Sequence, residues 1–277
     1  MTIIDGSSTV DPTLRSPRIL CLHGGGVNAE VFRLQARALI AGLSHTFRLV
    51  FANGPFLCDP SPEILPVYAD SGPYRRWLRW LPQDPIIDAN LAINEIWFQV
   101  RAAMDEDTAQ GADGPWVGLL GFSQGAKLSA SLLFDQQVRV EAARRGDTKA
   151  LMERATTWKF GVLLAGSAPL VSLSDYSTGR KCFVNAAEKS ESFDNAPRGD
   201  ETEGETQGYT LRIPTVHVHG VEDSGIHLHR RLLNKMDKNT VTLVEWDGNH
   251  RVPVKTVDVE RIVEATMSVA RKTGAIS

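Results

Sequence analysis

Length, composition and charge set the first limits on what this chain can be. It has 277 residues, 42% of them hydrophobic, which suffices for one sizeable core. The formal net charge is −3, so the chain lacks the basic excess typical of general nucleic-acid binding. Its three cysteines are widely spaced without a C-x-x-C pair, which favours free thiols. We find no secretory signal and no apolar run long enough to span a bilayer, so we expect a cytoplasmic protein without membrane association.

The predicted elements follow one another regularly along the chain. Residues 1–17 are polar and contain prolines, and we expect a flexible arm there before a single domain over 18–277. Continuous apolar runs predict six buried strands, at 19–22, 47–52, 116–122, 160–170, 213–220 and 241–246. Helical periodicity predicts helices over 28–43, 88–104, 123–145, 147–157, 227–236 and 252–272. Residues 54–87 are rich in proline and show no clear period, and the acidic, almost aliphatic-free residues 188–209 predict a mobile loop.

The alternation of strands and helices predicts the class of fold. The predicted strands are continuous apolar runs, whereas strands with one face in water alternate apolar and polar residues. Parallel strands joined by crossover helices are buried on both faces and give the continuous pattern. We therefore expect an α/β protein with a mostly parallel central sheet of about six strands and helices on both faces.

A G-x-S-x-G pentapeptide, Gly121-Phe122-Ser123-Gln124-Gly125, stands between a predicted strand and a predicted helix. A serine hydroxyl becomes a nucleophile when a base removes its proton and a tight strand–turn–helix elbow exposes it. Small residues beside the serine allow the chain to make that elbow. This context predicts that Ser123 is a nucleophile. The alternative is a serine that caps the helix beside two packing glycines.

A base and an orienting acid are expected on loops that follow later strands. His250 follows the last predicted strand, at the edge where parallel sheets place their chemistry, although an ordinary loop histidine is the alternative. Asp223 follows the preceding strand and would fix the tautomer of that histidine. Glu222 is its neighbour, and Asp247 is a rival whose Asp-Gly pair is typical of a turn. The chain order Ser123, Asp223, His250 is that of α/β-hydrolases.

Two backbone N–H groups are expected to form an oxyanion hole. The residue after the nucleophile, Gln124, supplies the first. The glycine turn His23-Gly24-Gly25-Gly26 supplies the second, with Gly25 as the first choice and Gly26 as the alternative. A phosphate-binding loop is a competing interpretation of this turn. It is disfavoured because the chain lacks both a Gly-Lys-Ser/Thr and a G-x-G-x-x-G with a following acid.

The chain also resembles a known family through five segments in series: ILCLHGGGVNAEVFRLQ, GPYRRW, GLLGFSQGA, VHVHGVED and GNHRVP. In order and spacing they resemble the FSH1-type serine hydrolases, which include fungal polyketide-releasing thioesterases and OVCA2-like hydrolases. The resemblance covers about residues 18–270. It implies an α/β-hydrolase fold without a large separate cap domain, and a triad of Ser123, Asp223 and His250. The acidic stretch at 188–209 departs from the compact forms of the family.

The aromatic and arginine cluster at 74–81 has a functional and a structural interpretation. Its aromatic rings could line an acyl pocket while an arginine binds a phosphate or an acidic carrier surface. Its spacing equally fits an amphipathic helix with buried tryptophans and solvated arginines. The family resemblance supports substrate binding for Tyr74 and Trp77.

A histidine group, His217, His219, His227 and His229, lies close to Asp223 in the sequence. Two histidines one residue apart on a strand share a face, as a metal site requires. The two on the predicted helix are not at the spacing that shares a face. We therefore expect no metal site here.

Together these features predict a serine hydrolase that needs no cofactor. It would cleave carboxylic ester or acyl-thioester bonds through an acyl-enzyme, and the family resemblance implies a thioesterase or esterase of fungal polyketide biosynthesis. The expected partner is a small-molecule acyl substrate, and the resemblance adds the acyl carrier protein of a polyketide synthase. The alternatives are a general short-chain carboxylesterase and a non-catalytic α/β-hydrolase-fold receptor for a small ligand.

Overall fold

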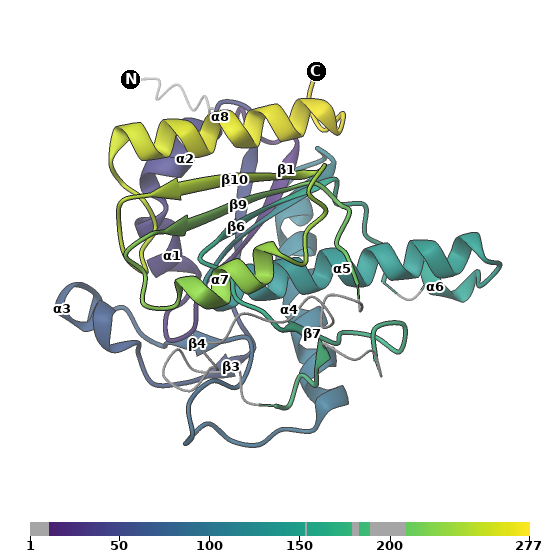
Figure 1. The fold of residues 1–277 in the computed structure, drawn as a ribbon, viewed down its shortest axis with the longest axis horizontal. Coiled ribbons are helices and arrows are strands. Elements are labelled where there is room, and N and C mark those ends of the chain that lie inside the picture. The colour runs from purple at the N-terminus through teal and green to yellow at the C-terminus, as the bar shows by residue number, and fades with distance from the viewer. Residues whose placement is uncertain (1–10, 153, 179–182, 189–208) are drawn as a thin grey trace, which may run out of the picture.

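The computed structural model describes residues 11–277 apart from 153, 179–182 and 189–208. Its centre is a six-stranded sheet in the order β10-β9-β6-β5-β1-β2, in which every neighbouring pair is parallel (Figure 1). The strands are β1 (Arg18–Leu22), β2 (Arg48–Ala52), β5 (Trp116–Phe122), β6 (Phe160–Leu164), β9 (Thr215–Gly220) and β10 (Val241–Trp246). The predicted α/β class is confirmed, and each of the six predicted strands is present.

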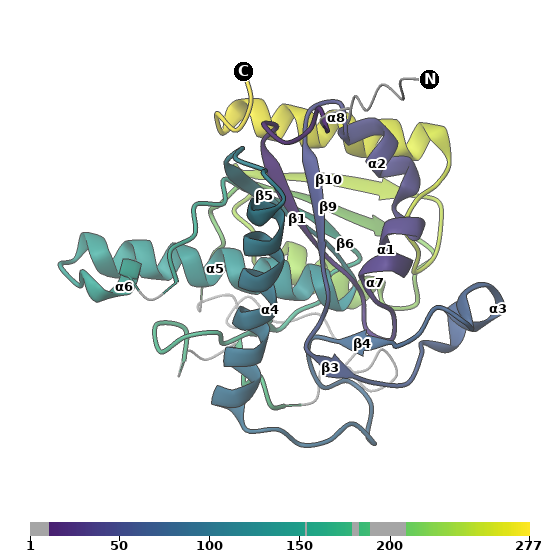
Figure 2. The ribbon, with the colours of Figure 1, turned by 180° about the vertical axis from the view of Figure 1, so that it is seen from behind.

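Helices cover both faces of this sheet (Figure 1, Figure 2). One face carries α1 (Ala29–Gln35), α2 (Arg37–Leu43) and α8 (Thr256–Lys272). The other carries α4 (Ala89–Ala109), α5 (Gln124–Arg144) and α7 (Ile226–Leu233). Successive side chains of a strand point to opposite faces, so Ile19 and Cys21 of β1 join one core and Leu20 and Leu22 the other. Both faces are therefore apolar, which explains the continuous hydrophobic runs.

The helix predicted over 28–43 is interrupted. Asn28 caps α1 by accepting a hydrogen bond from the Val31 N–H at 2.9 Å. Ala36 then leaves the helical region, with φ −87° and ψ 7°, and separates α1 from α2. The break lets α1 pack on β2 while α2 packs on α8. Within the helix predicted at 147–157, the structure shows the single turn α6 (Lys149–Met152).

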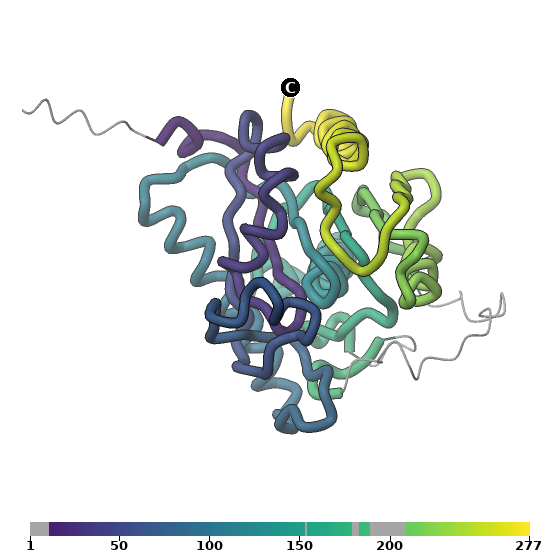
Figure 3. Tube along the Cα trace, turned by 90° about the vertical axis from the view of Figure 1, so that its left-hand side faces the viewer, coloured from purple at the N-terminus to yellow at the C-terminus, as the bar shows by residue number. Residues whose placement is uncertain are grey.

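A long excursion, residues 53–88, leaves the carboxyl end of β2, and we call it the strap. It contains β3 (Phe56–Leu57), a 3₁₀ turn (Pro62–Ile64), α3 (Leu65–Tyr68) and β4 (Arg75–Arg76). Strands β3 and β4 pair antiparallel, so the amphipathic helix considered for 74–81 is wrong. The strap lies at the opposite end of the molecule from α8 and the C-terminus (Figure 1, Figure 3). A second excursion forms a two-stranded parallel sheet from β7 (Leu170–Val171) and β8 (Phe183–Val184).

The described part of the N-terminal arm is packed against the sheet edge. The Arg48 N–H donates to the Pro17 carbonyl at 2.9 Å, and the Arg48 guanidinium donates to Asp11 at 2.6 Å. The edge strand thus supplies partners for residues 11–17 that composition does not reveal, and the flexibility of the arm stays a prediction. The rest of that arm, and all of the predicted loop 188–209 except its two end residues, lie outside the described residues. Within the described ranges, every helix is too short or too polar to cross a lipid bilayer.

Candidate active site

Ser123 lies at the tight turn between β5 and α5. Its backbone has φ 53° and ψ −116°, a strained conformation for a residue with a side chain. The Ser123 N–H donates to the Leu164 carbonyl at 2.8 Å, which holds the turn against β6. The serine is half-buried and lies at the carboxyl edge of the sheet.

The two glycines of the pentapeptide provide space for this turn. A Cβ on Gly125 would lie 2.0 Å from the Leu22 carbonyl oxygen, and a Cβ on Gly121 would lie 2.3 Å from the Gly125 oxygen. Neither glycine has a positive φ, so the backbone strain is at Ser123 itself. The glycines allow β1, β5 and the start of α5 to approach more closely than any side chain would permit.

The structure brings the three predicted side chains into one hydrogen-bonded row. His250 Nε2 lies 2.9 Å from Ser123 Oγ, and His250 Nδ1 lies 2.7 Å from Asp223 Oδ2. The Asp223 side chain is fully buried, whereas the sequence alternatives Glu222 and Asp247 are exposed. The side chains predicted to be nucleophile, base and acid therefore lie in the order and at the separations that acyl transfer would require.

Backbone contacts join the loop of the acid to the loop of the histidine. The Val221 N–H donates to the Trp246 carbonyl, and the Glu222 N–H donates to the Gly248 carbonyl, both at 3.0 Å. A Cβ on Gly220 would lie 2.0 Å from the Gly248 oxygen. This approach, open only to glycine, fixes the distance between the two loops.

The Asp223 carboxylate receives three hydrogen bonds. Oδ1 accepts from the Gly225 N–H at 2.8 Å, and Oδ2 accepts from His250 Nδ1 and from His229 Nε2, the latter at 2.9 Å. Burial raises the pKa of this carboxyl, but the hydrogen bonds from His229 and His250 outweigh it and hold the pKa well below its usual range. Asp223 is therefore ionised, as an orienting acid must be. The contact with His229 was not expected from the sequence.

The predicted oxyanion donors lie beside the elbow. The amide of Gln124 is the first N–H of α5, and the first N–H groups of a helix have no intrahelical acceptor. The Gly26 N–H already donates to the Arg75 carbonyl at 3.1 Å. A Cβ on Gly25 would lie 3.5 Å from Gln124 Nε2, which places Gly25 against the elbow. The Gly26 N–H is thus occupied by the strap, and the role of Gly25 as oxyanion donor stays a prediction.

His23 connects this glycine turn to the strap. It is fully buried; Nδ1 donates to the Gly24 carbonyl at 2.6 Å, and Nε2 accepts from the Gly54 N–H at 2.8 Å. Burial lowers the pKa of His23 to about 4, so the ring is neutral and Nε2 remains an acceptor. Sequence reasoning missed this role, although His23 begins the glycine turn.

The side chain of Gln124 also binds the strap. Its Oε1 accepts from the N–H groups of Trp77 and Leu78 at 2.7 and 3.1 Å, and its Nε2 donates to the Leu78 carbonyl at 3.0 Å. The Trp77 indole N–H donates to the His23 carbonyl at 3.0 Å. The strap is thus fixed to both turns that border Ser123.

The aromatic residues of the strap differ in their relation to the site. Trp77 is fully buried, so its ring supports the site from within and does not face solvent. Tyr74 is half-buried, and its hydroxyl donates to the carbonyls of Tyr68 and Ala69. The structure therefore shows structural contacts at the two predicted substrate-binding positions. Trp80 is closer to the glycine turn: its ring lies 3.4 Å from a Cβ built on Gly25.

The strap arginines bind the strap itself. Arg76 and Asp84 form a buried ion pair at 3.2 Å, and Arg79 Nε donates to the Asp84 carbonyl at 3.0 Å. Arg75 donates to the Gly54 carbonyl at 3.1 Å. These contacts favour the structural interpretation of the cluster, in a form that is not helical.

Three members of the histidine group, His217, His219 and His229, form a row of rings with His250. The centroids of His217 and His219, His219 and His229, and His229 and His250 are 5.4, 6.1 and 5.8 Å apart. Ligand atoms of Asp223, His229 and His250 lie within 4.8 Å of one another, close enough for a metal ion to use. Hydrogen bonds among these residues, Ser123 and the Gly166 carbonyl account for the arrangement without an ion.

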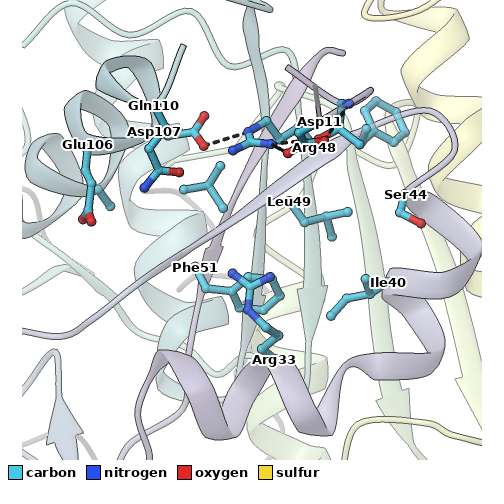
Figure 4. A pocket seen from close by; sticks show the side chains of 14 residues that line it. Asp11, Arg33, Ile40, Ser44, Arg48, Leu49, Phe51, Glu106, Asp107 and Gln110 are labelled. Carbon is cyan, nitrogen blue, oxygen red and sulfur yellow. Dashed lines mark hydrogen bonds and ion pairs between the residues drawn. The ribbon is translucent and has the colours of Figure 1, made fainter. Parts of the chain in front are cut away.

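A cavity of about 420 Å³ lies elsewhere, at the sheet edge formed by β2 (Figure 4). Its lining includes none of the residues predicted for the active site. Arg48, on its wall, is already paired with Asp11 and Asp107 at 2.6 and 2.7 Å. This cavity is therefore separate from the hydrogen-bonded row of Ser123, His250 and Asp223.

Comparisons with known proteins agree with this geometry. A family model described as serine hydrolase (FSH1) matches residues 13–262. Esterase pigG from Monascus ruber is 47% identical over 271 residues, covering 97% of both chains. Esterase citA from Monascus ruber is 46% identical over 267 residues, covering 96% of this chain and 97% of its own. The crystal structure of TT1662 from Thermus thermophilus superimposes with a TM-score of 0.50 at 14% identity, covering 92% of this chain and 89% of its own, which shows likeness of fold alone.

The family match and the two relatives cover nearly the whole chain, and they confirm the resemblance found in the sequence. The parallel sheet, its strand order and the serine elbow agree with that resemblance. This chain belongs to the FSH1 family of serine hydrolases and has the α/β-hydrolase fold.

Proposed function

We propose that this hydrolase cleaves carboxylic ester or acyl-thioester bonds, with Ser123 as nucleophile, His250 as base and Asp223 as orienting acid. The observation that carries the proposal is the continuous row from Ser123 Oγ through the His250 ring to Asp223 Oδ2, with contacts of 2.9 and 2.7 Å. The names of the two Monascus ruber relatives, both esterases, support the same bond class.

The first half-reaction forms an acyl-enzyme. Ser123 Oγ attacks the substrate carbonyl carbon while its proton passes to His250 Nε2, and the Asp223 carboxylate stabilises the resulting imidazolium. The N–H groups of Gln124 and Gly25 stabilise the negative oxygen of the tetrahedral intermediate. The bond to the leaving oxygen or sulfur then breaks, and His250 returns the proton to that atom.

The second half-reaction releases the acid. His250 Nε2 takes a proton from a water molecule, whose oxygen attacks the acyl carbonyl carbon. The second tetrahedral intermediate collapses, the proton returns to Ser123 Oγ, and the free carboxylic acid leaves. Every proton step uses side chains of this chain, and the cycle consumes only substrate and water.

The substrate we propose is an acyl chain carried as a thioester on the acyl carrier protein of a fungal polyketide synthase. Family resemblance supports this choice, and the ring of Trp80 beside Gly25 offers an apolar surface at the glycine turn. Hydrolysis of acyl-carrier thioesters should be compared with hydrolysis of matched free p-nitrophenyl esters. A higher kcat/KM on the carrier-bound chain supports the proposal. A preference for short free esters indicates a general carboxylesterase instead.

A fluorophosphonate probe tests the nucleophile directly. The wild-type protein should be labelled at Ser123, and Ser123→Ala should not be labelled. Ser129→Ala, which removes a buried serine further along α5, is the matched control and should be labelled like the wild type. A folded wild-type protein that resists the probe would favour the receptor alternative.

We also propose a cytoplasmic location. Among the described residues Cys21 is buried and free and Cys58 is half-buried and free, as is usual in a reducing compartment. Fractionation of producing cells should recover the protein with cytosolic markers, and recovery in the secreted fraction would contradict the proposal.

A further inference from the structure

His229 lies directly behind the proposed acid. His229 belongs to α7, and its side chain is fully buried. Its Nε2 is 2.9 Å from Asp223 Oδ2, the same oxygen that binds His250 Nδ1. The other ring nitrogen, Nδ1, is 2.9 Å from the Gly166 carbonyl oxygen. Each nitrogen of His229 therefore faces an oxygen.

Both of these oxygens are acceptors. A backbone carbonyl cannot donate a hydrogen bond, and an ionised carboxylate cannot donate either. A neutral imidazole has one N–H group and one lone pair, so a neutral His229 would direct its lone pair at one of the two oxygens. Only the ring with both nitrogens protonated satisfies the Gly166 carbonyl and Asp223 together.

We propose that His229 is a positioning residue that carries a positive charge beside Asp223 and thereby lowers the basicity of His250. The rings of His229 and His250 are nearly parallel, at 22°, with centroids 5.8 Å apart. At this distance a positive charge disfavours a second one on His250. The Gly166 contact also fixes the ring and, through it, the orientation of the Asp223 carboxylate. Because His229 acts through Asp223 and His250, the inference rests on the function proposed for them.

The other titratable groups around His229 do not supply this charge. His219 stacks on the far side of the ring, and its Nε2 contacts Glu245 at 2.9 Å. Burial lowers the pKa of His219, and burial lowers the pKa of His217 to about 3. Both rings are therefore neutral at neutral pH, so neither of them brings a positive charge next to Asp223.

The first test is the pH dependence of kcat/KM for His229→Gln. Glutamine keeps a donor for Asp223 but carries no charge, so the acid limb of the profile should move to higher pH by about one unit. His219→Gln, which changes the next ring in the row without touching Asp223, should leave that limb in place. An unchanged limb in His229→Gln, or equal shifts in the two variants, would overturn the inference.

The second test does not depend on activity. In ¹⁵N-histidine-labelled protein, the His229 ring should show two protonated nitrogens at neutral pH, assigned by the signals lost in His229→Gln. A bare ring nitrogen on His229 would refute the inference. The same spectrum can be recorded on Ser123→Ala, which has no nucleophile, so failure of the proposed function and failure of this inference give different results.

Discussion

The side chain of Gln124 forms a reciprocal pair of hydrogen bonds with the backbone of Leu78. The Leu78 N–H donates to Oε1 at 3.1 Å, and Nε2 donates to the Leu78 carbonyl at 3.0 Å. Leu78 lies in a part of the strap without regular secondary structure. There the Gln124 side chain, next to Ser123, binds the backbone as a neighbouring strand would. Elbow and strap are consequently one structural unit.

Gln124→Ala should reduce both stability and activity. The change leaves the buried N–H groups of Trp77 and Leu78 without their acceptor, at a cost of about 1–3 kcal/mol for a buried unsatisfied group. Loosening of the strap beside Ser123 should also lower kcat/KM by about tenfold or more, because small displacements of reacting groups strongly lower the reaction rate.

Gln137→Ala is the matched control for this variant. Gln137 lies further along α5 and makes the same type of contact away from the elbow, with the Thr210 carbonyl at 3.0 Å and the Arg212 N–H at 2.7 Å. Urea unfolding should show similar losses for the two variants, whereas kcat/KM should fall only in Gln124→Ala. Equal activities would contradict the assigned role of Gln124.

Trp80→Ala should alter the preference for acyl groups. The Trp80 ring lies against Gly25, and its removal enlarges the space beside the proposed oxyanion donor. We expect kcat/KM to rise for bulkier acyl chains relative to short ones in a series of p-nitrophenyl esters. Trp116→Ala, at the opposite end of β5 from Ser123, should retain the wild-type order. If Trp80→Ala ranks the esters by kcat/KM in the same order as the wild type, Trp80 does not contact the acyl group.

The buried histidines predict how stability depends on pH. Burial lowers the pKa of His23 to about 4 and that of His217 to about 3, from the usual 6.5. Between these values and 6.5 the unfolded chain binds more protons than the folded chain. The free energy of unfolding should therefore fall as the pH falls through this range, with a limiting slope of about 1.4 kcal/mol per pH unit for each group.

His217→Leu tests this explanation. Among the described residues neither nitrogen of the fully buried His217 ring makes a hydrogen bond of normal geometry, so leucine removes the titrating group at the cost of at most a weak contact with the His229 backbone. Urea unfolding at pH 7 and pH 4.5 should show a smaller difference for this variant than for the wild type. If the difference in the free energy of unfolding between the two pH values is the same in both proteins, groups other than His217 cause the pH dependence.

The sequence predicted those features that depend on local pattern. Six apolar runs became the six strands of the sheet, and Ser123, Asp223 and His250 stand where three of those strands end. Because the carboxyl ends of parallel strands lie along one edge of a sheet, the proximity of these three side chains could be predicted.

Features that depend on distant contacts could not be predicted in this way. His23 bonds to Gly54, 31 residues away, and Gln124 bonds to Leu78, 46 residues away. Nothing in the proline-rich strap indicates these partners. His229 was considered as a metal ligand, because residue type and spacing do not reveal that its ring meets a carbonyl on one side and Asp223 on the other.

The most direct test of the account is peptide-resolved mass spectrometry after rapid mixing with acyl thioesters and an acid quench. The account predicts a mass increase equal to the acyl group on the peptide that contains Ser123, and none on Ser123→Ala protein shown to be folded. An acyl group on a different residue, or turnover by Ser123→Ala at the wild-type rate, would contradict it.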